Sequence, residues 1–246
     1  CCMKIKIINP NTTWTMTEDI SVAGKKFARP DTEVYAVSPS TGPESIESMY
    51  DEYLAVPGVL SEIIKGDREE HADAFIIACF GDPGLLAAKE VTEKPVIGIA
   101  QAAFTVAKMI APNFSVVYVL DRSEQVVREA LHLHGVEQFC KSCRSTGLGV
   151  LDFDKDPETG LRALAEQGRK CVEGDGAECV VLGCAGFVQF VDALNQKLGV
   201  PVIDGVSPAV KFCEALVDMG CKTAKRSLWA SPEPKNILGL QDIVKF

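Results

Sequence analysis

The chain lacks a long apolar run, and this absence excludes one class of protein. A helix that crosses a membrane needs about 20 consecutive apolar residues, and no stretch of the sequence approaches that length. Lys4-Ile5-Lys6 leads directly into a short strand-like run, without the apolar core or the cleavage site of a signal peptide. We therefore expect a cytoplasmic protein without a membrane partner, and we take Met3 as its natural start.

Positive charge is scarce as well, with 25 Lys and Arg residues against 34 Asp and Glu residues and a net charge of −9. Nucleic acids are bound by clustered Lys and Arg side chains, and the sequence has no basic stripe with interleaved aromatics, so we predict no nucleic-acid partner. A G-x-G-x-x-G motif after the first strand and a Walker sequence are also missing. We expect a small-molecule ligand and no cofactor.

Histidine is rare, at three residues, whereas cysteine is abundant, at ten. Ten cysteines would indicate a disulfide framework in a small secreted domain, but this chain is neither small nor preceded by a signal peptide. Cys140 and Cys143 form a single C-x-x-C, with His132 and His134 upstream on an expected helix. A zinc site needs a second pair or His partners at ligand spacing. None follows, and we predict no metal site.

Short runs rich in β-branched residues alternate with longer amphipathic stretches, which is the pattern of parallel βαβ units. A chain of this length can form one large α/β domain or two smaller lobes. The expected strands are 4–8, 32–37, 72–78, 95–99, 115–120, 146–151, 178–183 and 200–203. The expected helices are 14–28, 50–65, 83–91, 101–110, 124–133, 157–172, 187–198 and 207–219.

The two halves of the chain repeat the same order of elements. In each half a buried strand ends in Cys-x-Gly, at Cys79-Phe80-Gly81 and at Cys184-Ala185-Gly186. In each half the closing short strand begins at or just after a proline, Pro95 or Pro201. This matching order indicates an internal duplication at the level of strands.

The duplication singles out Cys79 and Cys184 as candidates for chemistry. Ligands of open parallel sheets bind at the carboxyl ends of the strands, where both cysteines are expected. The glycine two positions later allows a tight turn, and the helix behind each turn should lower the thiol pKa.

Two thiols on opposite sides of one ligand suit the inversion of a stereocentre, since one group removes a proton and the other returns it. Backbone N–H groups beside each cysteine could hold the oxygen of an enolate-like intermediate. The alternative is that both are inert buried thiols.

Several motifs together carry a resemblance to a known family. They are Ile8-Asn9-Pro10-Asn11-Thr12-Thr13, Thr41-Gly42-Pro43 followed by Ser45-Ile46, Tyr50-Asp51-Glu52, the turn from Cys79 to Gly84, and the turn from Leu182 to Gly186. Through these motifs the chain resembles the aspartate/glutamate/hydantoin racemase superfamily, and within it the hydantoin and allantoin racemase branch. The similarity spans about Met3 to Gly220, and within the branch the chain resembles the allantoin racemase subgroup.

The resemblance implies an α/β fold of two pseudosymmetric lobes, each a short parallel sheet flanked by helices, with the active site in the cleft between them. We assign residues 3–98 and 205–246 to the first lobe and residues 99–204 to the second. The resemblance further implies a cofactor-independent racemase in which Cys79 and Cys184 are the acid/base pair. Its expected substrate is a hydantoin-type ring, allantoin first, which suggests a role in purine catabolism. A homo-oligomer is expected because enzymes of this size commonly form one.

Eight residues are expected to bind the substrate: Asn11, Ser45, Ile46, Phe80, Gly81, Gly183, Ala185 and Gly186. Relatives that act on free amino acids usually carry Thr or Asn after each cysteine, whereas this chain has Phe80-Gly81 and Ala185-Gly186. Small residues and backbone N–H groups suit a planar ureide ring better than a zwitterion. By propensity alone, Asn11 and Ser45 would be helix caps.

Other residues near the strand ends have weaker claims on the site. Asp82 is expected to cap the helix that starts at Pro83, and Phe104 is expected in the core. Ser123 and Asp204 could border the pocket.

Other functions stay open at this point. The same fold supports amino-acid racemases and decarboxylases, although a decarboxylase needs only one cysteine as proton donor. Hydrolysis by a cysteine nucleophile needs a base beside it, and His71, His132 and His134 are all expected outside the strand-end loops. A cytosolic small-molecule sensor of two α/β lobes would bind its ligand without turnover.

Overall fold

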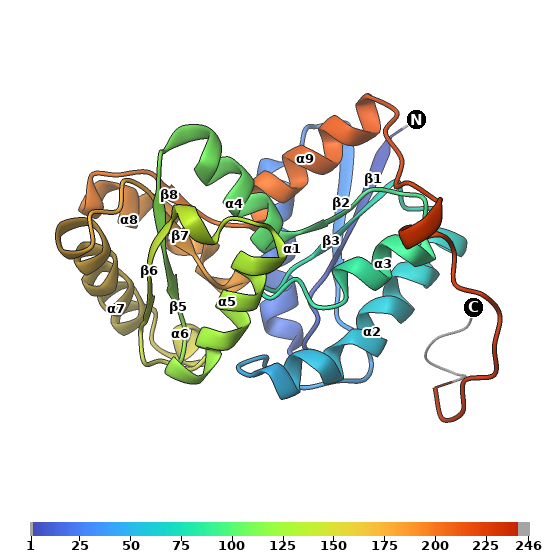
Figure 1. Ribbon diagram of the computed structural model, residues 1–246, viewed down its shortest axis with the longest axis horizontal. Helices are drawn as coiled ribbons and strands as arrows, with labels where there is room; N and C mark the ends of the chain where they lie inside the picture. Colours follow the sequence, from blue (N-terminus) through green and yellow to red (C-terminus); the bar gives the residue numbers. More distant parts are fainter. Residues whose placement is uncertain (1, 241–246) are drawn as a thin grey trace.

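The protein, described by a computed structural model over residues 2–240, contains two parallel sheets of four strands each (Figure 1). The first sheet has the order β2-β1-β3-β4 and the second the order β6-β5-β7-β8. Counted within each half of the chain, the two orders are identical. The expected α/β fold of two pseudosymmetric lobes is confirmed.

The first sheet is covered by helices on both faces. Its strands are β1 (Met3–Ile8), β2 (Thr32–Val37), β3 (Ala74–Ile77) and β4 (Val96–Gly98), and its helices are α1 (Trp14–Phe27), α2 (Met49–Arg68), α3 (Leu85–Val91) and α9 (Val206–Asp218). Because side chains alternate across a strand, Ile5 and Ile7 of β1 pack in the cluster that contains α1 and α9 residues, whereas Ile8 packs in the cluster with α2 and α3 residues.

The second sheet is built in the same way. Its strands are β5 (Phe114–Tyr118), β6 (Cys140–Ser145), β7 (Val180–Leu182) and β8 (Val202–Ile203), and its helices are α4 (Ile99–Ile110), α5 (Glu124–Leu133), α6 (Asp152–Lys155), α7 (Pro157–Arg169) and α8 (Val191–Leu198). Short 3₁₀ segments at Asp121–Ser123, Glu137–Phe139, Ala185–Phe190 and Ser227–Trp229 and a π-helical turn at Lys170–Gly174 complete the described elements.

The strand expected at 146–151 is wrong, because β6 runs from Cys140 to Ser145. β6 pairs with β5 on one side only, so this edge strand is half-exposed and its sequence is polar, which hid it from a search for apolar runs. The N–H of Thr146 donates to the carbonyls of Tyr118 and Val119, and Gly147 then turns the chain with a φ of 76°. The C-x-x-C pair consequently lies on a strand, not on a helix.

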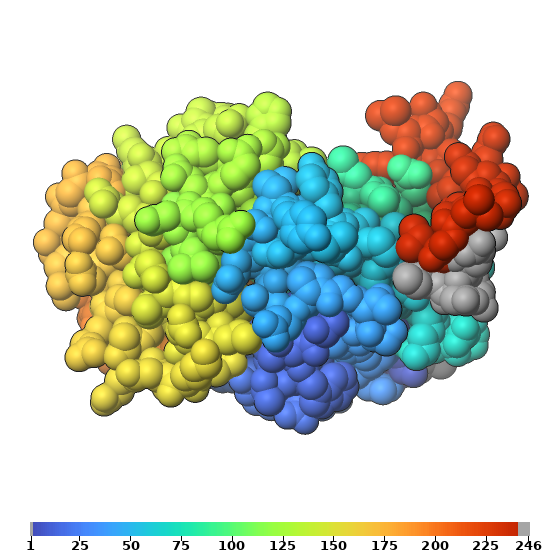
Figure 2. Space-filling view, turned by 90° about the horizontal axis from the view of Figure 1, so that it is seen from below, coloured from blue at the N-terminus to red at the C-terminus, as the bar shows by residue number. Residues whose placement is uncertain are grey.

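The two sheets share one continuous apolar core. A single cluster of buried residues contains Ile5 and Ile76 of the first sheet together with Val117 and Leu182 of the second. Figure 2 shows the blue-to-cyan and the green-to-yellow parts of the chain in contact along the middle of one face. Strands β1–β4 lie within residues 3–98 and strands β5–β8 within 99–204. The lobe boundaries stay a prediction, and residues 241–246 of the first lobe lie outside the described residues.

A search of residues 2–240 finds no helix that combines the length and the apolar character a bilayer crossing demands.

Candidate active site

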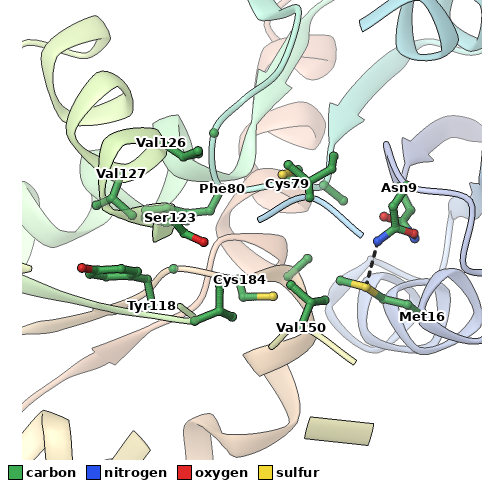
Figure 3. Close-up of a pocket in the computed structure, with 17 residues that line it drawn as sticks. Asn9, Met16, Cys79, Phe80, Tyr118, Ser123, Val126, Val127, Val150 and Cys184 are labelled. Carbon is green, nitrogen blue, oxygen red and sulfur yellow. Dashed lines mark hydrogen bonds between the residues drawn. The ribbon is translucent and has the colours of Figure 1, made fainter. Parts of the chain in front are cut away.

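Cys79 and Cys184 lie two residues beyond the last residues of β3 and β7, which are interior strands of their sheets. Both line one pocket, from opposite walls in the view of Figure 3. The pocket is lined by Asn9, Asn11, Met16, Ile46, Ala78, Cys79, Phe80, Gly81, Tyr118, Val119, Ser123, Val126, Val127, Val150, Gly183, Cys184 and Ala185. The two sheets thus deliver one thiol each to the same cavity.

The two cysteines have the same backbone contact. The N–H of Gly81 forms a hydrogen bond with the sulfur of Cys79, and the N–H of Gly186 does the same with the sulfur of Cys184. These bonds favour the thiolate over the thiol. They also occupy N–H groups that the sequence analysis expected to hold a substrate oxygen.

Burial dominates the electrostatics of both thiols. It raises the pKa of Cys79, with a further contribution from the nearby Glu52 carboxylate. It also raises the pKa of Cys184 to about 12. The expectation that helix N-termini lower these pKa values is wrong, since α3 begins only at Leu85 and Cys184 is followed by a 3₁₀ segment.

Comparisons with known proteins show the family to which the chain belongs. The sequence matches the Asp/Glu/Hydantoin racemase family over residues 5–213. The chain belongs to this family. It is 53% identical over 237 residues to a hydantoin racemase of Pseudomonas sp. (strain NS671), covering 96% of this chain and 95% of that protein. As a member of the family, the protein is a racemase and therefore an isomerase, which sets aside the sensor considered above.

Two solved structures of allantoin racemases resemble the racemase closely. The one from Klebsiella pneumoniae superposes with a TM-score of 0.95 at 42% identity, covering 98% of both chains. The one from Pseudomonas fluorescens gives a TM-score of 0.92 at 35% identity, covering 96% of this chain and 100% of that chain.

Six of the eight expected substrate-binding residues of the racemase line the pocket: Asn11, Ile46, Phe80, Gly81, Gly183 and Ala185. Ser45 and Gly186 do not belong to this lining, contrary to expectation. Gly186 faces a neighbouring cavity between α1 and α8. Ser45 does not cap α2 either, because that helix begins at Met49 and is capped by Ser48.

Asn11 serves the fold and faces the pocket at once. Its Oδ1 accepts hydrogen bonds from the N–H of Thr13 (3.0 Å) and from Nδ2 of Asn9 (2.7 Å), which shapes the turn before α1. Its Nδ2 donates to the sulfur of Met16 at 3.3 Å (Figure 3). A thioether is a weak acceptor, so a substrate carbonyl could replace it with little loss.

Asp82 caps a different helix from the one expected. Its carboxylate accepts hydrogen bonds from the N–H groups of Ala100 and Gln101, in the first turn of α4, and pairs with Nε2 of His134 at 2.8 Å. The expected helix instead starts at Leu85, after Gly84 with a φ of 75°. Asp82 itself has a φ of 49°, a conformation that Asn and Asp tolerate better than most residues.

The structure places the remaining three predicted residues in different surroundings. Ser123 lines the pocket, and its hydroxyl donates to the carbonyl of Glu47 at 2.8 Å. Asp204 lies elsewhere, because it accepts hydrogen bonds from the N–H groups of Val206 and Ser207 at the start of α9. Phe104 is buried in the core, as expected.

Several lining residues were not predicted from the sequence. Tyr118 and Val119 follow from the strand-end rule, because Tyr118 is the last residue of β5, the neighbour of β7, and Val119 comes directly after it. Val126 and Val127 on α5 and Val150 in the loop before α6 carried no local signal, since only the tertiary fold brings them to the pocket. In the part of the chain that the structure describes, no three His, Cys, Asp or Glu side chains are grouped so that they could hold a metal ion.

Proposed function

We propose that the enzyme inverts the stereocentre of a 5-substituted hydantoin ring by proton transfer between Cys79 and Cys184. The observation that carries this proposal is the placement of both thiols on one pocket, each with a glycine N–H group on its sulfur. A two-base inversion requires such a pair, with one group on each face of the reacting carbon.

The chemistry follows from the acidity of the C5–H bond beside the ring carbonyl. One cysteine, as thiolate, takes the C5 proton, and the electron pair moves onto the carbonyl oxygen to give a planar enolate. The other cysteine, as thiol, then donates its proton to the opposite face of C5 and becomes the thiolate. In the reverse direction the two residues exchange roles, and the Asn11 amide is placed to donate a hydrogen bond to a ring oxygen.

The pocket lining favours an uncharged substrate. None of the described residues that line it is Lys, Arg, His, Asp or Glu. A free amino acid would bring a carboxylate and an ammonium group, and burying unpaired charges is costly. This argues against glutamate or aspartate, whereas a hydantoin ring carries neither charge.

Allantoin, a hydantoin with a ureido group at C5, is the substrate that we propose first. Asn9, Asn11 and Ser123 supply polar side chains for that group, and the solved allantoin racemases share the fold over nearly the whole chain. Hydantoins with an apolar group at C5 are the second candidate. The apolar part of the pocket wall consists of Ile46, Val126, Val127 and Val150. The 53% identical relative is named hydantoin racemase.

A panel of pure enantiomers tests both candidates. Allantoin, 5-benzylhydantoin, glutamate and aspartate are incubated with the enzyme without added cofactor, and the loss of circular dichroism is followed against an enzyme-free control. We expect decay for one or both ring compounds and none for the amino acids. Racemisation of glutamate or aspartate faster than of either ring would contradict the proposal.

Three further aspects of this function stay predictions: a cytoplasmic location, a role in purine catabolism and a homo-oligomeric state. Light scattering coupled to gel filtration measures the last of them directly, and a mass equal to one chain of 26.5 kDa would contradict it.

A further inference from the structure

A half-buried glutamate, Glu52, packs against the Cys79 turn without being part of the pocket lining. Glu52 is in the first turn of α2. Its Oε2 atom is shielded from solvent and has no hydrogen-bond partner among the described residues. Burying a carboxylate oxygen without a partner is costly.

Glu52 packs directly against the turn that holds Cys79. A Cβ atom placed on Gly81 would lie only 2.7 Å from Cδ of Glu52 and 2.7 Å from Cγ1 of Val126. Gly81 is the residue whose N–H forms the hydrogen bond with the Cys79 sulfur. Glu52 on α2 therefore lies against the Cys79 turn at Gly81, the same residue that Val126 of α5 approaches from the other half of the chain.

The charged groups around Glu52 offer it no compensation. Asp82 in the turn and Glu129 on α5 are both acidic and act on it, and Asp82 is itself paired with His134. Burial first and these two carboxylates second raise the pKa of Glu52 to about 7. Glu52 in turn is the charged group that does most to raise the pKa of Cys79, ahead of Cys184 and Asp82.

Within residues 2–240, no carboxylate stands in the same relation to Cys184. The acidic groups that act on it are Asp154 and Glu47, and both rank behind burial and behind the opposing hydrogen bond from Gly186. Glu47 is also held elsewhere, because its Oε1 accepts a hydrogen bond from the N–H of Val150 at 2.9 Å. The two thiols are matched in backbone geometry but not in electrostatic surroundings.

We propose that the Glu52 carboxylate keeps Cys79 protonated, so that the thiolate of the resting enzyme forms first on Cys184. Glu52 is then a positioning residue that acts through Cys79 and does not touch the substrate. The inference rests on the proposed function for its catalytic meaning, since it makes the resting enzyme ready to deprotonate the enantiomer whose C5–H faces Cys184, with Cys79 as the acid.

The mechanism is a competition between negative charges in a buried site. While Glu52 is ionised, a thiolate on Cys79 would place two anions side by side in a medium of low dielectric constant. A thiolate on Cys184 avoids this. Once Cys184 is ionised, its charge further opposes ionisation of Cys79, so the pair holds one proton.

Alkylation of the two thiols, resolved by peptide mass spectrometry, tests the inference. Iodoacetamide reacts with the thiolate, so the rate at each cysteine reports its ionised fraction between about pH 6 and pH 9. In the wild type we expect Cys184 to react faster than Cys79. In Glu52→Gln we expect the Cys79 rate at pH 8 to rise roughly tenfold, the equivalent of one pKa unit, and the Cys184 rate to change less than about twofold.

Glu129→Gln is the matched control, because it removes one carboxylate from the same neighbourhood at an exposed position that is not against Gly81. It should leave the Cys79 rate within about twofold. An unchanged Cys79 rate in a folded Glu52→Gln variant, or an equal rise at both cysteines, would overturn the inference. Glu52→Leu serves as a second charge-free variant if the Gln side chain disturbs folding.

A measurement of kcat/KM against pH, beside the alkylation rates, distinguishes failure of this inference from failure of the proposed function. For the enantiomer whose C5–H faces Cys79, the limb of kcat/KM against pH that reports thiolate formation should move to lower pH in Glu52→Gln, whereas for the opposite enantiomer, which Cys184 deprotonates, the limb should stay in place. Alkylation needs no turnover, so it still tests the inference if the wild type racemises none of the ring compounds, a result that would contradict only the proposed function. A shifted alkylation profile with both kinetic limbs unshifted would overturn the catalytic meaning assigned to Glu52.

Discussion

The Cys79 turn and the Cys184 turn are two versions of one structure that have diverged in their surroundings. Each follows an interior strand, and each places a glycine N–H on its sulfur. After Cys79 the chain makes a turn through Asp82, whose carboxylate caps α4, and Glu52 packs against it. After Cys184 the chain enters a 3₁₀ segment at once. The two turns therefore share their place at a strand end and the glycine N–H at the sulfur, whereas the acidic groups beside each thiol differ.

The largest effect should come from removing either thiol. In Cys79→Ser and in Cys184→Ser, we expect racemisation of the best ring substrate to fall about 10²- to 10⁴-fold, because a hydroxyl is a poor base and a two-base inversion needs both groups. Polarimetry measures the rate, and far-UV circular dichroism checks the fold. Near wild-type turnover in either variant would show that the two turns are not equivalent partners in catalysis.

Alanine substitutions at Gly81 and Gly186 should lower the free energy of unfolding by different amounts. In Gly81→Ala the new Cβ would meet Glu52 and Val126 at 2.7 Å, so we expect a loss of about 1–3 kcal/mol in the free energy of unfolding. In Gly186→Ala the nearest atoms are 3.8 Å away on Met16 and 3.9 Å away on Cys184, and the loss should stay within about 0.5 kcal/mol. Urea denaturation of both variants measures the difference, and equal losses would contradict it.

The free energy of unfolding should depend on pH because Glu52 ionises at a different pH in the folded and the unfolded protein. Its pKa is raised from 4.5 to about 7 in the folded protein, so the folded state favours the neutral form. The resulting stabilisation is complete below about pH 4.5 and is lost as the pH rises through about 7.

Because Glu52 is partly exposed, we expect this pH-dependent loss in the free energy of unfolding to be about 1–2 kcal/mol. The loss should be absent in Glu52→Gln. The free energy of unfolding measured between pH 4.5 and 7.5 tests it, with Glu129→Gln expected to keep the wild-type slope. A wild-type slope in Glu52→Gln would show that Glu52 is not the group responsible.

The smallest effect should come from the second cysteine pair, Cys140 and Cys143. Their sulfur atoms lie 3.8 Å apart on the edge strand β6, and neither residue lines the pocket. The double variant with Ser at both positions should keep kcat/KM within about twofold. A larger loss would show that the catalytic sulfurs are not limited to the duplicated turns.

Local patterns in the sequence were enough to predict most of the fold. Apolar β-branched runs marked β1, β3, β5 and β7 because these interior strands are buried between helices. The edge strand β6 failed this test, since one exposed side allows polar residues such as Lys141 and Arg144. The prediction took the apolar loop residues Val150 and Leu151 for the strand instead.

The site could be predicted where it depends on strand ends and not where it depends on packing between the lobes. The positions of Cys79 and Cys184 followed from the repeated Cys-x-Gly turns. Val126 reaches the pocket only because α5 packs over it, and Glu52 matters only because Gly81 leaves room for its carboxylate. No periodicity or motif encodes such contacts between distant segments.

If the two thiols act on opposite faces of one carbon, the proton that returns to C5 comes from the solvent-exchanged thiol. Proton NMR of a single enantiomer of the best ring substrate, converted in D₂O and corrected for the enzyme-free rate, measures this. We expect the product enantiomer to carry deuterium at C5 from the earliest turnovers, while the remaining substrate keeps its protium. Protium retained in the product, or deuterium entering the substrate before any inversion, would contradict it.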